Sequence, residues 1–308
     1  MQETNQHTSF FSPIYWPAWI LIGILWFLSK LPYRAQLFLG KWLGILIYQF
    51  NTRMKHIAKV NIHLCFPKLS EAEKTSLLKK NFISIGIGVF ETCLAWWGSN
   101  SQLKKLAHFH NFEVIQKALS LGKGVILMGE HFTSLEIVGR LCSSQFPFSV
   151  IYRKHKIAFV ENFISKAYKK YYAQPIERHD VRSTLRRLKR GEIVWFTPDV
   201  DAGHFHNVFV PFFGIRASSL IASSRLPAIT GAKVIPAYFY RRDDGTGYDI
   251  TASDPLEDFP TGEVEADVAR VNQMQENFIR KKPEQYMWQY MRFKTRPEGE
   301  KRFYSTKS

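Results

Sequence analysis

From residue 122 onward, short apolar runs alternate with longer segments of helical periodicity. Alternation of this kind is typical of an α/β fold with a mostly parallel sheet flanked by helices. No internal repeat or low-complexity linker interrupts the pattern. The predicted strands are Val125–Met128, Phe148–Tyr152, Ile193–Thr197, Val234–Tyr240 and Tyr248–Thr251, and the predicted helices are Ser134–Ser144, Ala158–Tyr171, Val181–Lys189, Ser218–Thr230 and Glu263–Arg280.

The N-terminal segment Phe10–Leu28 is nearly all apolar and carries no charged residue. A helix of that length spans roughly the 30 Å hydrocarbon core of a bilayer, so the segment predicts a membrane-anchoring helix. Pro13 and Pro17 make its first part irregular, so the regular helix is expected to begin near Pro17 and to be short. The alternative is a buried core helix. Basic residues follow the segment at Lys30, Arg34 and Lys41, which puts the bulk of the protein in the cytoplasm by the positive-inside rule.

A second apolar block, Leu37–Phe50, is interrupted by Lys41 and reads as an interfacial helix. We therefore divide the chain into an N-terminal transmembrane or interfacial anchor, residues 1–50, and a catalytic domain, residues 51–308. Ser70 and Glu73 form a capping box at the start of a further helix. Its apolar positions, expected in the core, are Leu77, Leu78, Phe82, Ile85, Val89, Cys93 and Trp97.

The chain is strongly basic, with 42 Lys and Arg against 26 Asp and Glu and a net charge of +16. Such a field attracts nucleic acid, anionic lipid, phosphorylated substrates or an acidic carrier protein. No nucleic-acid-binding motif is present, and the apolar N-terminus favours the membrane. The sequence also lacks a serine-hydrolase elbow, a Walker A loop and a dinucleotide fingerprint. Cys65, Cys93 and Cys142 are widely spaced and are expected to be free thiols.

The segment His131–Glu136 follows the predicted strand Val125–Met128 and precedes a predicted helix. His131 then lies on a strand-to-helix turn at the carboxyl edge of the sheet, where open α/β folds hold ligands. An imidazole there suits a general base, and the Glu136 carboxylate is a group able to orient it. The alternative is a structural histidine with a glutamate favoured by the helix dipole.

Four further segments carry candidate chemistry. Arg153 ends a predicted strand and could hold a phosphate. Asp199 and Asp201 leave another strand, and with His204 and His206 they permit a metal site, although a polar loop with internal turns is the simpler interpretation. The remaining two are the apolar segment 208–214, expected to meet lipid or to line a pocket, and the aromatic and basic segment 283–299, whose structural alternative is a packed C-terminal element.

Together these segments resemble the bacterial lipid A biosynthesis late acyltransferases, the lauroyl and myristoyl transferases with an H-x4-D/E signature. The resemblance covers nearly the whole chain, with its parts in the right order. The residues that carry it are His131–Glu136, Tyr152-Arg153, Leu188–Trp195, Pro198–Asp201, Phe209–Gly214, Gly247-Tyr248, Pro283–Tyr286 and Arg292–Gly299.

The resemblance implies transfer of a fatty acyl group from acyl carrier protein to a hydroxyl on an acyl chain of a Kdo-bearing lipid A precursor. It implies that His131 is the general base with Glu136 as its partner. It also implies a place in the bacterial inner membrane, with the catalytic domain on the cytoplasmic face. The chemistry agrees, since an alcohol attacking a thioester must lose its proton and needs no covalent enzyme nucleophile. Backbone N–H groups near the helix start after His131 are candidate oxyanion donors.

We assign substrate binding to Arg153, Asp199 and Arg292, and we expect no cofactor and no nucleic-acid partner. We expect Asp199 to organise Arg153 or a neighbouring loop and to hold no catalytic metal. Three alternatives stay open: an acyltransferase with another glycolipid acceptor or with acyl-CoA as donor, a metal-dependent glycosyltransferase that uses Asp199 and Asp201, and a basic membrane-binding protein without activity.

The chain departs from the family pattern at several positions. Tyr290 and Met291 replace a His and an Arg that are frequent in the family, and Lys154 follows Arg153 where proline is usual. The segment 217–222 replaces a threonine-rich stretch. These departures bear on the acceptor position and the acyl-chain preference, and they leave His131 and Glu136 untouched.

Overall fold

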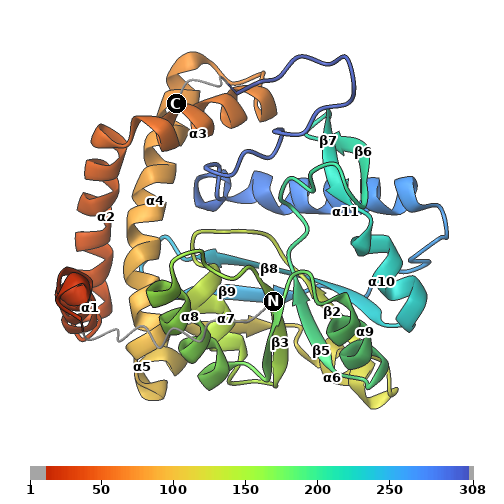
Figure 1. Cartoon of the computed structure of the whole chain (residues 1–308), viewed down its shortest axis with the longest axis horizontal. Coiled ribbons are helices and arrows are strands. Elements are labelled where there is room, and N and C mark those ends of the chain that lie inside the picture. The colour runs from red at the N-terminus through yellow and green to blue at the C-terminus, as the bar shows by residue number, and fades with distance from the viewer. Residues whose placement is uncertain (1–11, 305–308) are drawn as a thin grey trace.

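The computed structural model describes residues 12–304 and has a seven-stranded sheet at its centre (Figure 1). The strand order is β1-β9-β8-β2-β5-β3-β4, and every neighbouring pair is parallel except β8 and β9. This confirms the predicted α/β class with a mostly parallel sheet. The strands are β1 (Ala107–His110), β2 (Val125–Met128), β3 (Phe148–Tyr152), β4 (Gln174–Glu177), β5 (Ile193–Phe196), β8 (Lys233–Arg241) and β9 (Tyr248–Ala252), with a separate hairpin of β6 (Asn207–Phe212) and β7 (Ile215–Leu220).

Helices flank the sheet, and α2 and α4 run side by side at one end of it (Figure 1). The capping box of Ser70 and Glu73 starts α4 as predicted, and its apolar positions Leu77, Leu78, Phe82, Ile85 and Cys93 are buried. The helices are α1 (Trp16–Leu28), α2 (Tyr33–Phe50), α3 (Thr52–Cys65), α4 (Glu71–Trp97), α5 (Asn100–Lys104), α6 (Glu113–Ser120), α7 (Leu135–Cys142), α8 (Ala158–Tyr171), α9 (Val181–Lys189), α10 (Ala222–Thr230) and α11 (Val264–Lys281), with the 3-10 turns η1 (Pro13–Tyr15) and η2 (Pro283–Gln285).

The hairpin β6–β7 corrects two predictions. The apolar segment 208–214 is not a lipid-facing loop, because Phe212 and Phe213 are buried and Asn272 of α11 donates to the carbonyl of Pro211 at 2.9 Å. The predicted helix Ser218–Thr230 begins only at Ala222, because Ser218–Leu220 belong to β7 and pair with β6. Antiparallel pairing with the preceding strand β6 decided this outcome against the local helical pattern.

The N-terminal helix is shorter than a transmembrane segment. Phe10 lies outside the described residues, η1 starts at Pro13, and α1 begins only at Trp16. At 1.5 Å per residue α1 is about 20 Å long, against the roughly 30 Å of a bilayer core. Among residues 12–304, no helix combines the length and the apolar character needed to cross a membrane, so the expected spanning anchor is not supported. Pro13 and Pro17 explain the shortening, as the irregular start uses up much of the apolar run.

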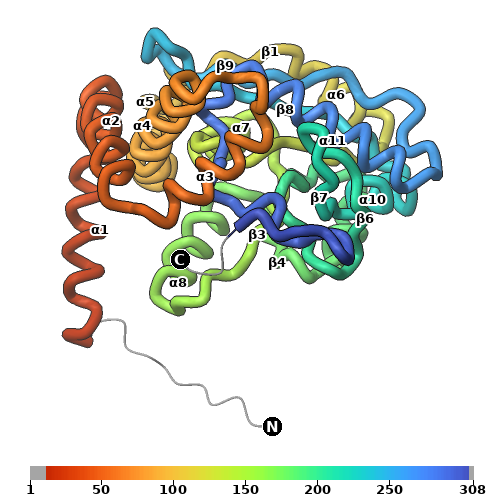
Figure 2. The backbone as a smooth tube through the Cα atoms, turned by 90° about the horizontal axis from the view of Figure 1, so that it is seen from above, coloured from red at the N-terminus to blue at the C-terminus, as the bar shows by residue number. Residues whose placement is uncertain are grey.

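Figure 2 shows α1 extending away from the rest of the protein. None of its residues is buried, and Ile20, Ile24 and Phe27 are at least half exposed. On its inner side, Trp19 makes edge contacts with Phe159 and Phe163 of α8. The helix therefore presents an apolar outer face.

Helix α2 packs tightly against α4 through glycines. A Cβ added at Gly86 would lie 2.2 Å from the carbonyl oxygen of Gly40, and one at Gly44 would lie 2.3 Å from that of Phe82. The two helix backbones meet where no side chain separates them, so α2 is fastened to the α/β body. The division of the chain at residue 50 stays a prediction.

Candidate active site

The register of two neighbouring strands brings His131 and Asp199 together. Met128 of β2 lies opposite Phe196 of β5 in a parallel pair, and each strand ends there. His131 and Asp199 both follow their paired residue by three positions, so the two turns meet at the same carboxyl edge of the sheet. This is the edge at which open α/β sheets hold their ligands.

Asp199 orients the His131 ring. Its Oδ1 lies 2.7 Å from His131 Nδ1, and its Oδ2 accepts the backbone N–H of His131 at 2.9 Å. The side chain of Asp199 is fully buried, whereas that of His131 is 20% exposed. A proton held on Nδ1 by the carboxylate leaves Nε2 with its lone pair, and Nε2 lies 3.4 Å from the hydroxyl of Thr197.

The charges of this pair support each other. Burial disfavours the imidazolium, but the Asp199 carboxylate outweighs burial and raises the pKa of His131 above its ordinary value. Burial likewise opposes ionisation of Asp199, and the His131 charge and hydrogen bonds outweigh it, so the pKa of Asp199 is lowered. Asp199 thus organises a neighbouring loop, as expected, because its Oδ2 holds the backbone N–H of His131 in the turn after β2. The Arg153 alternative is not seen: within residues 12–304 the ionic partner of Asp199 is the His131 ring, which strand register places beside it.

Glu136 has a different partner from the one predicted. The hydroxyl of Tyr168 on α8 donates to Glu136 Oε1 at 2.5 Å, while the Nδ1 of His131 is taken by Asp199. Burial raises the pKa of Glu136 more than the Tyr168 hydrogen bond lowers it. Glu136 is the second residue of α7, and its contact with Tyr168 joins the start of α7 to α8. The pairing of Glu136 with the His131 ring is thus corrected, and its catalytic role stays a prediction.

A third carboxyl group, Glu130, lies directly before His131. It is fully buried, and within the described residues neither of its carboxyl oxygens has a hydrogen-bond partner. Burial, with the Asp199 charge added, holds the pKa of Glu130 well above its usual range. The neutral acid is therefore favoured, and Asp199 is the carboxylate that carries charge next to His131.

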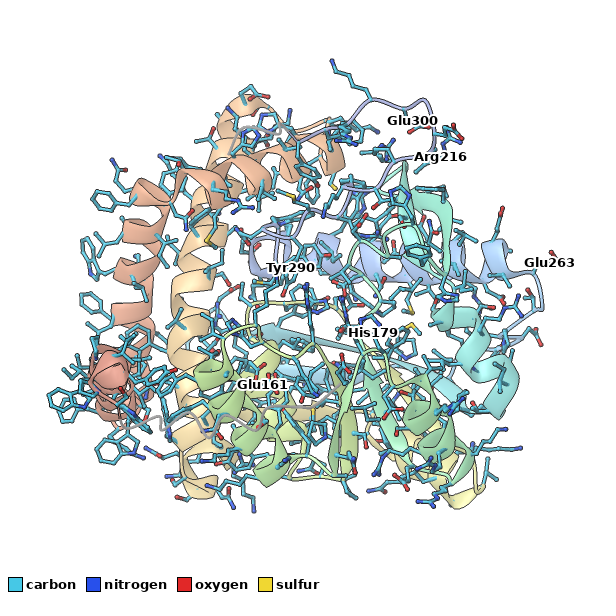
Figure 3. The ribbon with its side chains drawn as sticks, viewed as in Figure 1. Glu161, His179, Arg216, Glu263, Tyr290 and Glu300 are labelled. Atoms are coloured by element: carbon cyan, nitrogen blue, oxygen red, sulfur yellow. The ribbon has the colours of Figure 1, made fainter. Side chains whose placement is uncertain are left out.

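The C-terminal segment closes the other side of the site. Backbone hydrogen bonds join Thr133 N to Gln285 O at 2.8 Å and Met287 N to His131 O at 2.9 Å. The ring of Tyr290 meets the His131 ring edge-on, with centroids 5.2 Å apart, and Figure 3 labels Tyr290 near the middle of the molecule. Tyr290 is 42% exposed, so it forms an accessible wall beside the base.

Asn61 of α3 fixes this wall. Its side-chain amide donates to the carbonyls of Trp288 and Tyr290, both at 2.7 Å. Its Oδ1 accepts a hydrogen bond from the hydroxyl of Tyr304 at 2.5 Å, so one buried amide holds the C-terminal segment through three hydrogen bonds.

A buried ion pair supports the turn from behind. Arg241 of β8 binds both carboxyl oxygens of Glu91 on α4, at 2.5 and 2.6 Å, and its Nη1 donates to Ser84 at 3.0 Å. Ser84 in turn lies 2.7 Å from the hydroxyl of Thr133, two residues after His131. Such a pair is costly to break because it leaves a buried charge uncompensated.

Of the predicted substrate-binding residues, Arg153 is exposed and Arg292 is buried. Arg153 is exposed at the end of β3, the strand beside β5, and thus lies at the same sheet edge as His131. Arg292 is buried and donates to Ser218 O and Ser219 Oγ at 2.6 and 2.7 Å, so it fastens β7. Asp201 accepts both the N–H and the hydroxyl of Thr295 at 2.9 Å and turns away from Asp199 toward the C-terminal segment. No cluster of three or more metal-ligating side chains exists within residues 12–304.

Comparison with known proteins identifies the family. A family model described as bacterial lipid A biosynthesis acyltransferase matches residues 3–295. The chain is 34% identical to the lipid A biosynthesis lauroyltransferase of Escherichia coli over 95% of its own length and 96% of that protein, and 34% identical to the palmitoleoyltransferase of the same organism over 96% of each. It is 24% identical to the E. coli myristoyltransferase over 97% of its own length and 93% of that protein.

The chain belongs to the lipid A biosynthesis acyltransferase family. It is therefore an acyltransferase, and the resemblance seen in its sequence is confirmed. The alternatives of a glycosyltransferase and of a membrane-binding protein without activity are wrong. The former also loses its structural basis, because Asp199 and Asp201 bind different partners. In this member of the family, the His131–Asp199 pair is the candidate chemical centre.

Proposed function

We propose that the protein transfers a fatty acyl group from acyl carrier protein to a hydroxyl on an acyl chain of a Kdo-bearing lipid A precursor. The observation that carries the proposal is the 2.7 Å contact of His131 Nδ1 with Asp199, which leaves Nε2 as a base at the sheet edge. A buried carboxylate on one imidazole nitrogen and a free lone pair on the other is the arrangement of a general base for hydroxyl activation.

In the proposed reaction, Nε2 of His131 takes the proton of the acceptor hydroxyl as its oxygen attacks the thioester carbonyl. The tetrahedral intermediate bears an oxyanion, for which the first amides of α7 are the nearest helix N-terminus. The intermediate expels the thiolate of the carrier, and the proton on Nε2 passes to that sulfur. Asp199 stabilises the imidazolium that exists between the two steps. The basic charge of the chain favours an acidic carrier protein and a phosphorylated acceptor.

We further propose that the protein works at the cytoplasmic face of the bacterial inner membrane, with α1 and α2 lying in the interface. The support is the outward apolar face of both helices, where Ile20, Phe27, Phe38 and Phe50 are all more than half exposed. Interfacial helices bury such faces among lipid headgroups and upper acyl chains without spanning the bilayer.

The test has two parts. Purified protein is given acyl carrier protein charged with fatty acids of several lengths, or the matching acyl-CoA, together with a Kdo-bearing lipid A precursor, and the product is read by mass spectrometry. We expect one added acyl group from the carrier-bound donor and no product with His131→Ala. Product from acyl-CoA alone, or from a different glycolipid alone, would contradict the proposed substrates. Mass spectrometry of lipid A from cells that lack or overproduce the protein gives the same answer in vivo.

A further inference from the structure

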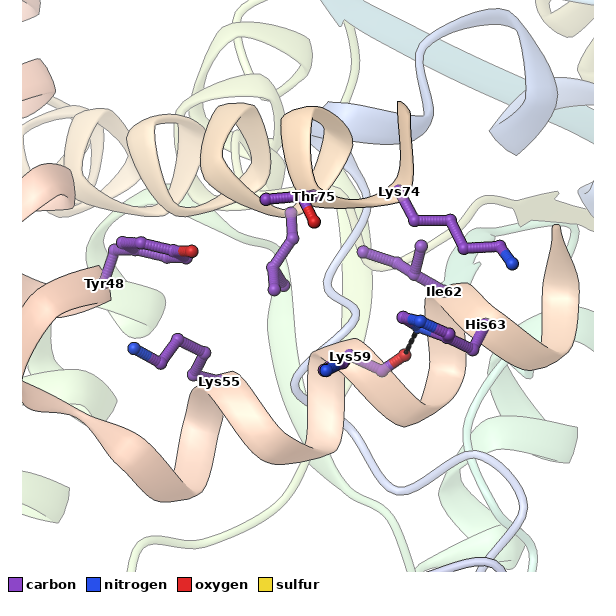
Figure 4. Close-up of a pocket in the computed structure, with 8 residues that line it drawn as sticks. Tyr48, Lys55, Lys59, Ile62, His63, Lys74 and Thr75 are labelled. Carbon is purple, nitrogen blue, oxygen red and sulfur yellow. Dashed lines mark hydrogen bonds between the residues drawn. The ribbon is translucent and has the colours of Figure 1, made fainter. Parts of the chain in front are cut away.

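A basic cavity lies between α3 and α4, separate from the residues around His131. It has a volume of about 170 Å³, and lysines enter it from both helices: Lys55 and Lys59 from α3, and Lys74 from α4 (Figure 4). This volume is well above the space needed for a single water, so a phosphate-sized group fits. The floor is apolar, formed by Tyr48, Ile62 and Leu78.

The charges of the cavity are only partly compensated. Glu71 accepts Lys74 Nζ at 2.9 Å and lies 2.9 Å from His63 Nε2, so it serves that end of the cavity. Lys55 Nζ lies 4.6 Å from the centre of the Tyr48 ring, a cation–π contact that leaves its charge in place. For Lys59 Nζ, no ion pair or hydrogen bond to another described residue is formed, and Lys59 is exposed. Two lysine charges therefore face the space without a counterion from the described chain.

The apolar side chains next to the cavity indicate which kind of anion it binds. An open groove at the α2–α3 corner, lined by Leu46, Phe50 and Arg53 among others, lies at the start of α3, the helix that also carries Lys55 and Lys59. It continues the exposed face of α2, where Phe38, Trp42, Leu46 and Phe50 recur at helical spacing and are each more than half exposed. Apolar side chains that lead up to lysines reproduce the order of a membrane surface, with acyl chains below and phosphates above.

We propose that this cavity binds the phosphate of an anionic membrane phospholipid whose acyl chains lie along the apolar face of α2. The lysines supply point charges for the phosphate oxygens, and the apolar floor receives the glycerol end of the lipid. The site would hold the protein at the bilayer in a defined orientation. The inference is independent of the acyl-transfer reaction, because none of its residues contacts His131 or Asp199 in the described structure.

The test is flotation of the full-length protein with vesicles of phosphatidylcholine, with and without phosphatidylglycerol, in the absence of any acyl donor or acceptor. The pocket variant is Lys55→Gln with Lys59→Gln, and the matched control is Lys117→Gln with Lys123→Gln, two exposed lysines on and after α6. A lysine at an anionic membrane surface is worth about fivefold in partitioning, so the pocket variant should bind phosphatidylglycerol vesicles about 25-fold more weakly. The control should bind like the wild type, and binding to pure phosphatidylcholine should not change.

Competition with inorganic phosphate tests whether the anion in the cavity is a phospholipid phosphate or free phosphate. At matched ionic strength it should displace the wild type from phosphatidylglycerol vesicles and leave the residual binding of the pocket variant unchanged. Equal losses in pocket and control variants would reduce the effect to net charge and overturn the proposal. Phosphate binding without any preference for phosphatidylglycerol would assign the cavity to free phosphate, and loss of carrier-protein binding with unchanged vesicle binding would assign it to the donor; each overturns the lipid site. Lys59→Glu, a change at an exposed position, repeats the test if the double variant folds poorly.

Discussion

At the scale of single residues, Asp199 is the position on which the proposed mechanism depends most. Asp199→Asn removes the charge and the tautomer control while conserving shape, and we expect activity to fall by up to about 10⁴-fold, the cost of the same change in a Ser-His-Asp triad. The measurement is acyl transfer by purified protein, with circular dichroism to confirm folding. Asp201→Asn is the control, since Asp201 accepts hydrogen bonds from Thr295 and, within residues 12–304, forms none with His131. Comparable losses in both variants would mean that Asp199 acts only through the fold.

The same pair sets a pH dependence. Since the pKa of His131 is raised, kcat/KM should rise with pH and level off above the ordinary imidazole pKa of about 6.5, and Asp199→Asn should move this inflection down. The contributions of His131 and Asp199 to folding stability change with pH in opposite directions. The contribution of His131 is complete below about pH 6.5 and is lost as pH rises through its folded pKa, whereas that of Asp199 is complete above about 3.9 and is lost as pH falls through its folded pKa. An inflection that stays in place in Asp199→Asn would contradict the pairing.

The contact of Glu136 with Tyr168 gives a third expectation. If Glu136 acts by holding α7 to α8, then Glu136→Gln and Tyr168→Phe disturb one shared contact, and their effects on kcat/KM should not add. A double-mutant cycle should return a coupling of about 1–3 kcal/mol. Additive losses, with Glu136→Gln as damaging as His131→Ala, would instead favour a direct role of Glu136 at the base.

At the scale of elements, the α2–α4 crossing is the most sensitive packing contact. Gly86→Ala would place a methyl group 2.2 Å from the carbonyl of Gly40, and overpacking of this kind costs about 3 kcal/mol. We expect a clear fall in Tm by calorimetry. Gly23→Ala in α1 is the matched control: an added Cβ there meets nothing within 4 Å, and alanine is the better helix former. Equal Tm values for the two variants would show that the helices separate without loss of stability.

The elements also show how far sequence reasoning reached. The fully buried strands β2 and β5 are continuous apolar runs, and β3, β8 and β9 are rich in apolar and aromatic residues; the prediction of all five is confirmed to within a few residues. The two strands of the central sheet that it missed lack that signal: β4 lies at the sheet edge and contains Pro175, and β1 contains two histidines. Such strands form because a neighbour offers its backbone, which no local pattern records.

The candidate site divides in the same way. His131 and Asp199 were both selected as chemically important, yet their pairing requires knowing that β2 and β5 are adjacent and in register. The available signal was that each residue follows an apolar strand at a similar distance. Glu136 is the expected partner of His131 because it is near in sequence, but its carboxylate accepts a hydrogen bond from Tyr168 of α8. The position of Thr197 beside the imidazole depends on folding and has no signal in the sequence, whereas Tyr290 stands out only as a departure from the family pattern.

At the scale of the whole molecule, the outward face of α1 should govern access to a membrane-embedded acceptor. Changing Ile20, Ile24 and Phe27 together to serine removes three exposed apolar side chains from one helix face. We expect at least roughly tenfold weaker vesicle binding, because each buried apolar side chain contributes on the order of 1 kcal/mol or more. Turnover of a detergent-dispersed acceptor should stay unchanged. Unaltered vesicle binding would show that α2, and not α1, makes the contact with the membrane.

The hydrogen bonds of Asn61 to the C-terminal segment affect the order in which the protein folds during its synthesis. The amide lies on α3, near the beginning of the chain, and its partners Trp288 and Tyr290 come 227 and 229 residues later. Chain closure over such a separation is slow, and it cannot begin until the C-terminal segment has left the ribosome. The nascent protein can thus form its sheet while the wall beside His131 is still missing. The wall beside His131 is therefore completed only after the C-terminal segment has emerged.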